Sequence, residues 1–356
     1  MVRKIGVLLA TLWITAIVNA KDHVTVEFQG GVSMPSGVTA VAFSPNGNLI
    51  AAGCNDHVII WDHAGQQLSD YPVVDEADKP APNDNPLTPA PQYHISIRQL
   101  RYSRDGKLLA AACQDSAARV WDTTTGKLLW QLQELKGGAF AVSFSPDGKW
   151  LATGGGERAV KIWDMATGKL AHSLVGHQYD IHALYFVDDN TVRSAAVGEP
   201  QETAPRTELR LWDIQKEVCS SINVAGPLPD GCLYDPSGYN FFAPCTSSFN
   251  YFARVFDAGT GSLSSSSDAI AEAIAVSQND QVLVGVNTYH SGRRGSLKVE
   301  VSVYLHRPDG FTRKTYITRA SVLGMGKGSI ALSPQGNTIA VGLPGGELQM
   351  YTFTVY

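Results

Sequence analysis

A short module of apolar strands occurs seven times along this chain, and in its clearest copies it ends in the dipeptide Trp-Asp. The three clearest copies span residues 41–62, 100–122 and 142–164, and weaker copies span residues 183–213, 232–257, 274–305 and 330–352. Three of the six intervals between successive turns are 42 residues, and the others are longer. The sequence therefore indicates one structural unit of about 42 residues, repeated with insertions.

The composition of each module favours strands joined by tight turns. Residues that bend the chain at little cost form the turns, as in Pro45-Asn46-Gly47 and Pro146-Asp147-Gly148. β-Branched and aromatic residues flank these turns, and no long stretch has helical periodicity. A strand-built period near 40 residues is typical of propeller blades. We therefore predict an all-β fold, a seven-bladed β-propeller of four-stranded antiparallel blades.

Four Trp-Asp dipeptides stand at the expected distance after these turns, and they begin at Trp61, Trp121, Trp163 and Trp212. With these spacings the chain resembles the WD-repeat family over roughly residues 23–356. The resemblance implies a propeller that acts as a platform for binding other proteins.

Members of that family often link a Gly-His dipeptide, a Ser or Thr, an Asp and the Trp in a buried hydrogen-bonded set. Gly176-His177 stands at the expected place, and Asp115 fits the acidic position of its own repeat. We expect His177 to be structural, and we expect no blade to assemble the whole set.

The two ends of the chain predict a closed ring. After the last module only residues 353–356 remain, which are too few for a fourth strand. Residues 23–28 form an isolated alternating strand ahead of the first module. We expect this strand to complete the seventh blade and to remove exposed strand edges.

Residues 1–20 have the composition of a cleavable signal peptide. Arg3 and Lys4 precede an apolar run that ends near Val18-Asn19-Ala20, and the run is too short to span a bilayer. The predicted domains are therefore a signal peptide (1–20) and a propeller (21–356), with a periplasmic or extracellular location and no membrane span after cleavage. An uncleaved anchor and an apolar arm on a cytosolic protein are the alternatives. Cleavage changes the net charge from −5 to −7, which disfavours nucleic acid as a partner.

The five cysteines contain no C-x-x-C pair, so the sequence predicts neither a zinc site nor a dithiol redox site. Cys54, Cys113 and Cys245 occupy equivalent small-residue positions, where buried filler is the expected role. The candidate disulfide joins Cys232 and Cys245 on adjacent strands of one blade, and Cys219 is an alternative partner for Cys232.

Insertions are expected on one face of the ring. They fall at the entry to the second blade (72–92) and in the links between the second and third strands of blades four, five and six (198–206, 244–250 and 287–295). Recognition residues commonly lie on loops held by a rigid scaffold. The candidate partner-binding residues on this face are Phe249, Tyr251, Tyr289, His290, Arg293 and Arg294, because aromatic residues beside arginine are typical of protein interfaces. A packing role for the aromatic residues and a solvated loop tip for the arginines are the alternatives.

Catalytic motifs are absent from the sequence. It contains no H-E-x-x-H, no G-x-S-x-G and no phosphate-binding loop. We therefore predict no catalytic, cofactor-binding or metal-binding residues, and a monomeric propeller whose partner is a protein. The alternatives are an envelope hydrolase or lyase with its site in the central channel, and a binder of carbohydrate or peptidoglycan.

Overall fold

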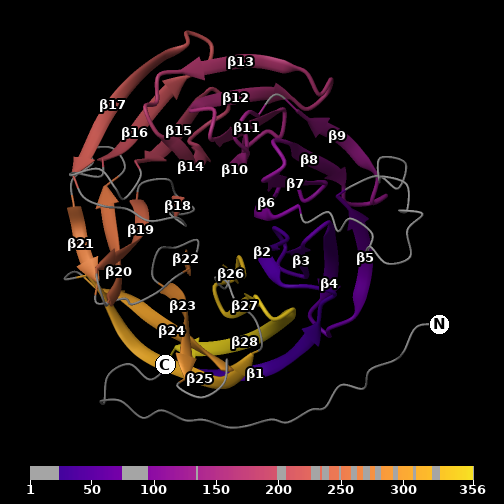
Figure 1. Cartoon of the computed structure of the whole chain (residues 1–356), viewed down its shortest axis with the longest axis vertical. Helices are drawn as coiled ribbons and strands as arrows, with labels where there is room; N and C mark the ends of the chain where they lie inside the picture. Colours follow the sequence, from indigo (N-terminus) through magenta and orange to yellow (C-terminus); the bar gives the residue numbers. More distant parts are fainter. Residues whose placement is uncertain are drawn as a thin grey trace, which may run out of the picture.

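Seven four-stranded antiparallel sheets make up the protein. The computed structural model describes residues 24–73, 95–133, 135–198, 206–225, 233–234, 240–247, 250–257, 263–267, 273–276, 282–291, 296–307, 310–322 and 329–355. The sheets form a ring, and one edge of each sheet lies nearest the centre (Figure 1). The predicted all-β propeller fold is confirmed. The described residues contain no helix, and so none that is long and apolar enough to cross a membrane.

In six sheets the strands follow chain order from the inner to the outer edge (Figure 1). These strands are β2 (Val38–Phe43), β3 (Leu49–Cys54), β4 (His57–Asp62) and β5 (Gln67–Pro72); β6 (Ile97–Tyr102), β7 (Leu108–Cys113), β8 (Ala118–Asp122) and β9 (Leu128–Leu132); β10 (Ala139–Phe144), β11 (Trp150–Gly155), β12 (Ala159–Asp164) and β13 (Leu170–Val175); β14 (Asp180–Phe186), β15 (Thr191–Val197), β16 (Arg206–Asp213) and β17 (Val218–Ala225); β18 (Leu233–Tyr234), β19 (Asn240–Ser247), β20 (Asn250–Asp257) and β21 (Leu263–Ser267); β22 (Ala273–Val276), β23 (Val282–Ser291), β24 (Ser296–Arg307) and β25 (Gly310–Val322).

The seventh sheet combines the two ends of the described chain. Its order is β1 (Val24–Ser33), β28 (Glu347–Val355), β27 (Thr338–Leu343) and β26 (Ser329–Leu332). β1 pairs antiparallel with β28 from Val24 opposite Val355 to Ser33 opposite Glu347. The predicted closing strand is therefore confirmed, and it is longer than the alternating pattern indicated.

Apolar side chains of neighbouring sheets pack together and join the sheets into a ring. The tryptophan of each described Trp-Asp pair contributes to a buried cluster between sheets, and Trp121 stacks on Tyr71 of the preceding sheet with ring centroids 6.2 Å apart. Glycine in the second strand lets sheets approach closely, because Gly154 lies directly against Ile181 of the next sheet. Burial between sheets is the main stabilising contribution to the ring.

The added residues of blades five and six lie mostly in strands. Pro244 pairs with Ala253 in the β19–β20 ladder, and Asn287 pairs with Glu300 in the β23–β24 ladder. The expectation that ranges 244–250 and 287–295 are enlarged links is therefore corrected, because these residues extend the hairpins. The strand ends that flank ranges 74–94 and 199–205, which lie outside the described residues, are on the face where the inner strands begin.

Candidate functional site

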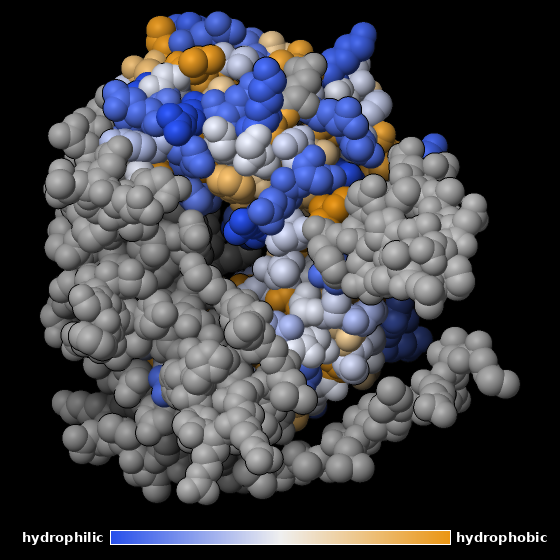
Figure 2. Space-filling view, viewed as in Figure 1, coloured by the Kyte–Doolittle hydropathy of each residue, from blue (hydrophilic) through white to orange (hydrophobic). Residues whose placement is uncertain are grey.

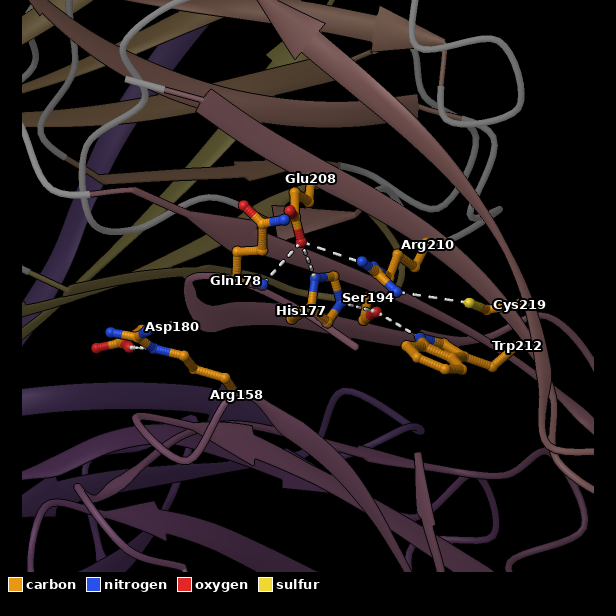
Figure 3. A network of polar contacts seen from close by, with 9 residues as sticks. All are labelled: Arg158, His177, Gln178, Asp180, Ser194, Glu208, Arg210, Trp212 and Cys219. Carbon is orange, nitrogen blue, oxygen red and sulfur yellow. Dashed lines mark hydrogen bonds and ion pairs between the residues drawn. The ribbon is translucent and has the colours of Figure 1, made fainter. Parts of the chain in front are cut away.

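A buried chain of hydrogen bonds crosses the sheet β14–β17 (Figure 3). The indole Nε1–H of Trp212 donates to Ser194 Oγ at 2.8 Å, and the Ser194 hydroxyl contacts His177 Nε2 at 2.6 Å. His177 Nδ1 lies 3.0 Å from Glu208 Oε2, which also accepts from the backbone N–H of Gln178 at 3.1 Å. The chain of hydrogen bonds joins the link before β14 to two strands of the same sheet, β15 and β16.

The partners of His177 define its tautomer and its charge. Ser194 Oγ accepts from Trp212, so its own proton donates to His177 Nε2, and the proton of the imidazole is on Nδ1 facing Glu208. Burial lowers the pKa of His177 from 6.5 to about 4, although the hydrogen bond to Glu208 acts in the opposite direction. His177 is therefore neutral at pH 7, and Arg210, whose Nε lies 3.6 Å from Glu208 Oε2, provides the positive charge beside that carboxylate.

This network corrects the expectation that no blade assembles the whole hydrogen-bonded set. The fourth blade does so, with Glu208 in the role expected for aspartate. Asp115 precedes Trp121 by six residues and lies before β8, the strand that contains Trp121. Glu208 precedes Trp212 by four residues and lies within β16. The longer side chain of glutamate reaches the histidine from this later position.

Neighbouring sheets contain only parts of the set. Trp163 Nε1 donates to Thr153 Oγ1 at 2.9 Å, but Ala52 and Ala111 occupy the equivalent second-strand position in the first two blades. The buried indole N–H groups of Trp61 and Trp121 accordingly have no hydrogen-bond partner within the described part of the chain. The missing hydroxyl groups explain why the first two blades lack the set, whereas the third blade has the Thr153 hydroxyl but carries the buried Leu135, 42 residues before His177, in place of the histidine.

The network cannot act directly on a ligand. The side chain of His177 has no exposed surface, and a catalytic group must contact its substrate. The histidine therefore has the structural role that the sequence predicted. Nor do the described residues contain a group of three or more His, Cys, Asp or Glu side chains that could hold a metal ion.

A second group of side chains lies where the inner strands begin. Each of β2, β6, β10 and β14 has a β-bulge near its first residue. The bulge leaves one residue of each strand without a partner in the ladder to the next strand, and these residues are Thr39, Arg98, Phe140 and His182. A bulge re-aims the side chain of its extra residue, and bulges are common beside functional sites. The inner strands surround the centre of the ring, and Figure 2 shows the surface hollowed there.

Three of these side chains contact one another in a row across successive sheets. The Arg98 guanidinium carbon lies 5.5 Å from the centroid of the Phe140 ring. The rings of Phe140 and His182 have centroids 5.2 Å apart and planes inclined by 33°. We name Arg98, Phe140 and His182 the channel-mouth set. Sequence reasoning missed it, although its members are 42 residues apart, in step with the repeat.

Polar contacts between sheets hold the surroundings of the channel-mouth set in place. The backbone N–H of Val142 in β10 donates to Gln99 Oε1 of β6 at 2.8 Å. Arg158 Nε lies 3.3 Å from Asp180 Oδ1, and this ion pair connects the β11–β12 link to the start of β14 (Figure 3). Each contact joins adjacent sheets, so the mouth of the channel has a fixed shape before any ligand binds.

The predicted partner-binding residues lie at the tips of two hairpins or outside the described residues. Tyr289 and His290 are near the end of β23, opposite Lys298 and Leu297, and Tyr251 is the second residue of β20. Phe249, Arg293 and Arg294 lie outside the described residues. The β19–β20 and β23–β24 hairpins leave the ring on the face where the inner strands begin, which is the face of the channel-mouth set.

The cysteine predictions have mixed outcomes. Cys54 and Cys113 are buried free thiols, as expected for filler, and burial raises their pKa to about 11 and about 12. Cys219 is an exposed free thiol that Arg210 contacts at 3.5 Å. Cys245 lies in β19, and Cys232 lies outside the described residues, so the disulfide stays a prediction.

The fold and the repeats define the class of this chain as a β-propeller that carries WD40 repeats. The family profile described as WD domain, G-beta repeat matches residues 27–62, 91–122 and 126–164. The solved structures to which the chain is similar include U3-55K (TM-score 0.67, 14% identity, covering 92% of this chain and 98% of that one). They also include the RRP9 WD40 repeats (TM-score 0.69, 14% identity, covering 92% of this chain and 97% of that one). At this identity the similarity shows the fold.

A sequence relative comes from Saccharomyces cerevisiae and is named pre-mRNA-processing factor 17. It is 33% identical over 102 residues, which are 28% of this chain and 18% of that protein. The chain thus spans less than a fifth of the length of this relative. Pre-mRNA is processed inside the cell, so the relative overturns the prediction that the protein is exported to the periplasm or beyond the cell. The predicted signal peptide, residues 1–20, lies outside the described residues.

Proposed function

We propose that this protein is an interaction scaffold that binds a partner protein on the face where its inner strands begin. One observation supports this choice of face above others. The channel-mouth set, the strand ends that flank ranges 74–94 and 199–205, and the hairpin ends at Tyr251 and Tyr289 all belong to it. The links of the opposite face, such as 123–127 and 165–169, are tight turns of five residues.

The proposed mode of binding follows from the rigidity of the ring. Sheets that pack on both neighbours hold their links in fixed positions, so little conformational entropy is lost when a partner binds. Aromatic and arginine side chains contribute most to such interfaces. We assign the main contacts to the predicted residues of this face, which are Phe249, Tyr251, Tyr289, His290, Arg293 and Arg294.

The relative found by sequence supports an intracellular role. That protein is, by its name, a pre-mRNA-processing factor, and its similarity extends over 102 residues of this chain. A scaffold that brings other proteins together is consistent with such a setting. We infer that this chain acts as a monomeric ring within a larger assembly.

A binding experiment with two matched double variants tests the choice of face. The full chain is used as bait in an extract of the cells that produce it, and captured proteins are identified by mass spectrometry. We expect Arg293→Ala with Arg294→Ala to weaken binding of the principal partner roughly thirtyfold, which corresponds to a loss of about 2 kcal/mol. The melting temperature should stay the same.

The control pair is Lys127→Ala with Lys169→Ala, which removes two exposed lysines from the turns of the opposite face. This pair should bind the partner as the unaltered protein does. Loss of binding in the control pair, with full binding by the arginine pair, would show that the partner occupies the opposite face.

A further inference from the structure

Two arginines of the inner strand β6 have no carboxylate partner. No ion pair joins Arg98 or Arg101 to an acidic group of the described residues, whereas Arg119 and Arg158 each contact an aspartate. Arg101 donates to the backbone carbonyl of Leu100 at 3.3 Å, which leaves its charge uncompensated. Surrounding protein lowers the pKa of Arg101, although solvent reaches the side chain.

The contact with Phe140 orients Arg98 for recognition. A guanidinium over an aromatic ring uses its flat face for that contact. Its N–H donors lie in the guanidinium plane, in the fork that matches the two oxygens of a carboxylate, and none of them is used in the contact with the ring face. His182 contacts the same Phe140 ring, and Gln99 ties β6 to β10. The guanidinium is therefore positioned before a ligand arrives.

We propose that Arg98, with Phe140 as a support, forms a binding site for carboxylate side chains in an acidic segment of a partner protein, and that Arg101, three residues further along β6, contributes a second positive charge to it. This inference rests on the proposed scaffold function, and it names the chemical groups of the partner that the scaffold would bind. An acidic peptide fits better than a nucleic acid, because the whole chain has a net charge of −5 and a sequence pI of about 6.0. Tight binding of a nucleic acid requires neutralisation of many phosphates, which a chain of this net charge does not favour, whereas two arginines suffice for one or two carboxylates of a short segment.

Fluorescence anisotropy with three labelled probes tests this site on the full chain. The probes are a ten-residue peptide of alternating Glu and Gly, the same peptide with Gln in place of Glu, and a ten-nucleotide oligouridylate. We expect the Glu peptide to bind at least about tenfold more tightly than the Gln peptide, and this preference should weaken as salt rises. We expect the oligouridylate to bind more weakly than the Glu peptide.

Variants separate the proposed site from general charge effects. Arg98→Ala with Arg101→Ala should reduce affinity for the Glu peptide about tenfold or more, and Arg98→Lys should have an intermediate effect because lysine lacks the planar fork. The control pair Lys127→Ala with Lys169→Ala removes the same charge from the opposite face and should leave affinity unchanged. A circular dichroism melt of each variant confirms folding, and Arg98→Gln replaces the double variant if that one unfolds.

Three results would overturn the inference. They are equal binding of the Glu and Gln peptides, equal loss of affinity in the control pair, and tighter binding of the oligouridylate that depends on Arg98. If the arginine variants still capture the principal partner from extract while Arg293→Ala with Arg294→Ala does not, the scaffold function stands and the carboxylate site is wrong.

Discussion

At the scale of single residues, the buried His177 of the fourth blade links the stability of its sheet to pH. His177 is neutral because it is buried, and both of its ring nitrogens have partners, in Glu208 and Ser194. If Nε2 gained a proton, it could no longer accept the hydrogen bond from the Ser194 hydroxyl. The new positive charge would also lie in a low-dielectric region. Protonation therefore favours the unfolded chain.

The lowered pKa of His177 predicts a loss of stability in acid. Below its ordinary pKa of 6.5 the unfolded chain binds a proton that the folded chain does not bind until the pH falls to about 4. The free energy of unfolding should therefore decrease as the pH is lowered between these values. Urea unfolding at several pH values measures this decrease in the free energy of unfolding. His177→Gln should be less stable at pH 7 and should have a shallower pH dependence.

The control for this prediction is His172→Gln, which removes a histidine from the surface of β13. The loss of stability in acid should persist in this variant, because the buried His177 is retained. Parallel curves for His177→Gln and the unaltered protein would show that His177 does not cause the loss of stability in acid.

At the scale of strands and sheets, the sequence indicated the repeating unit but not its local irregularities. Turn residues and alternating apolar residues predicted the strands of the first three blades. The β-bulges at Arg98, Phe140 and His182 break the two-residue alternation of side chains along a strand. Strand patterns in the sequence therefore do not reveal where the bulges are. Glu208 escaped prediction for a related reason, because a glutamate within a strand ordinarily indicates a solvated position.

Close packing between sheets predicts a large effect of one added methyl group. A Cβ at Gly154 would lie 2.6 Å from Ile181 Cγ2 in the next sheet, too close for unchanged packing. We expect Gly154→Ala to lower the free energy of unfolding by about 1–3 kcal/mol. Ile181→Ala removes the obstructing atom, so the double variant should be more stable than the sum of the two single effects indicates. Urea unfolding of all three variants provides the comparison.

Leu109→Ala is the matched control for this pair, because Leu109 is buried in a cluster that does not include Gly154 or Ile181. Its effect should add to that of Gly154→Ala. Simple additivity in both pairs would mean that contact between Gly154 and Ile181 does not limit how closely the sheets pack.

At the scale of the whole molecule, the ring depends on joining the two ends of the chain in one sheet. This arrangement could be predicted by counting strands, because the last module lacks one and residues 23–28 provide a spare one. The chemistry of the ring could not be predicted in the same way, since the channel-mouth set exists only when three sheets, each 42 residues from the next, lie side by side. Contacts of that kind depend on how successive sheets pack against one another.

Removal of β1 should therefore open the ring and destabilise the whole protein. Val24 is buried between sheets, Phe28 lies against Tyr351 with ring centroids 5.4 Å apart, and Val32 packs on the cluster that joins the seventh sheet to the first. Deleting residues 1–33 exposes these apolar surfaces and leaves the edge of β28 unpaired, so we expect aggregation or a fall in melting temperature of about 10 °C or more. Deleting residues 1–20 leaves β1 intact and should not change the melting temperature. Differential scanning calorimetry of both truncated chains measures these melting temperatures. If the chain without residues 1–33 melted at the same temperature as the full chain, the ring would stay closed without β1.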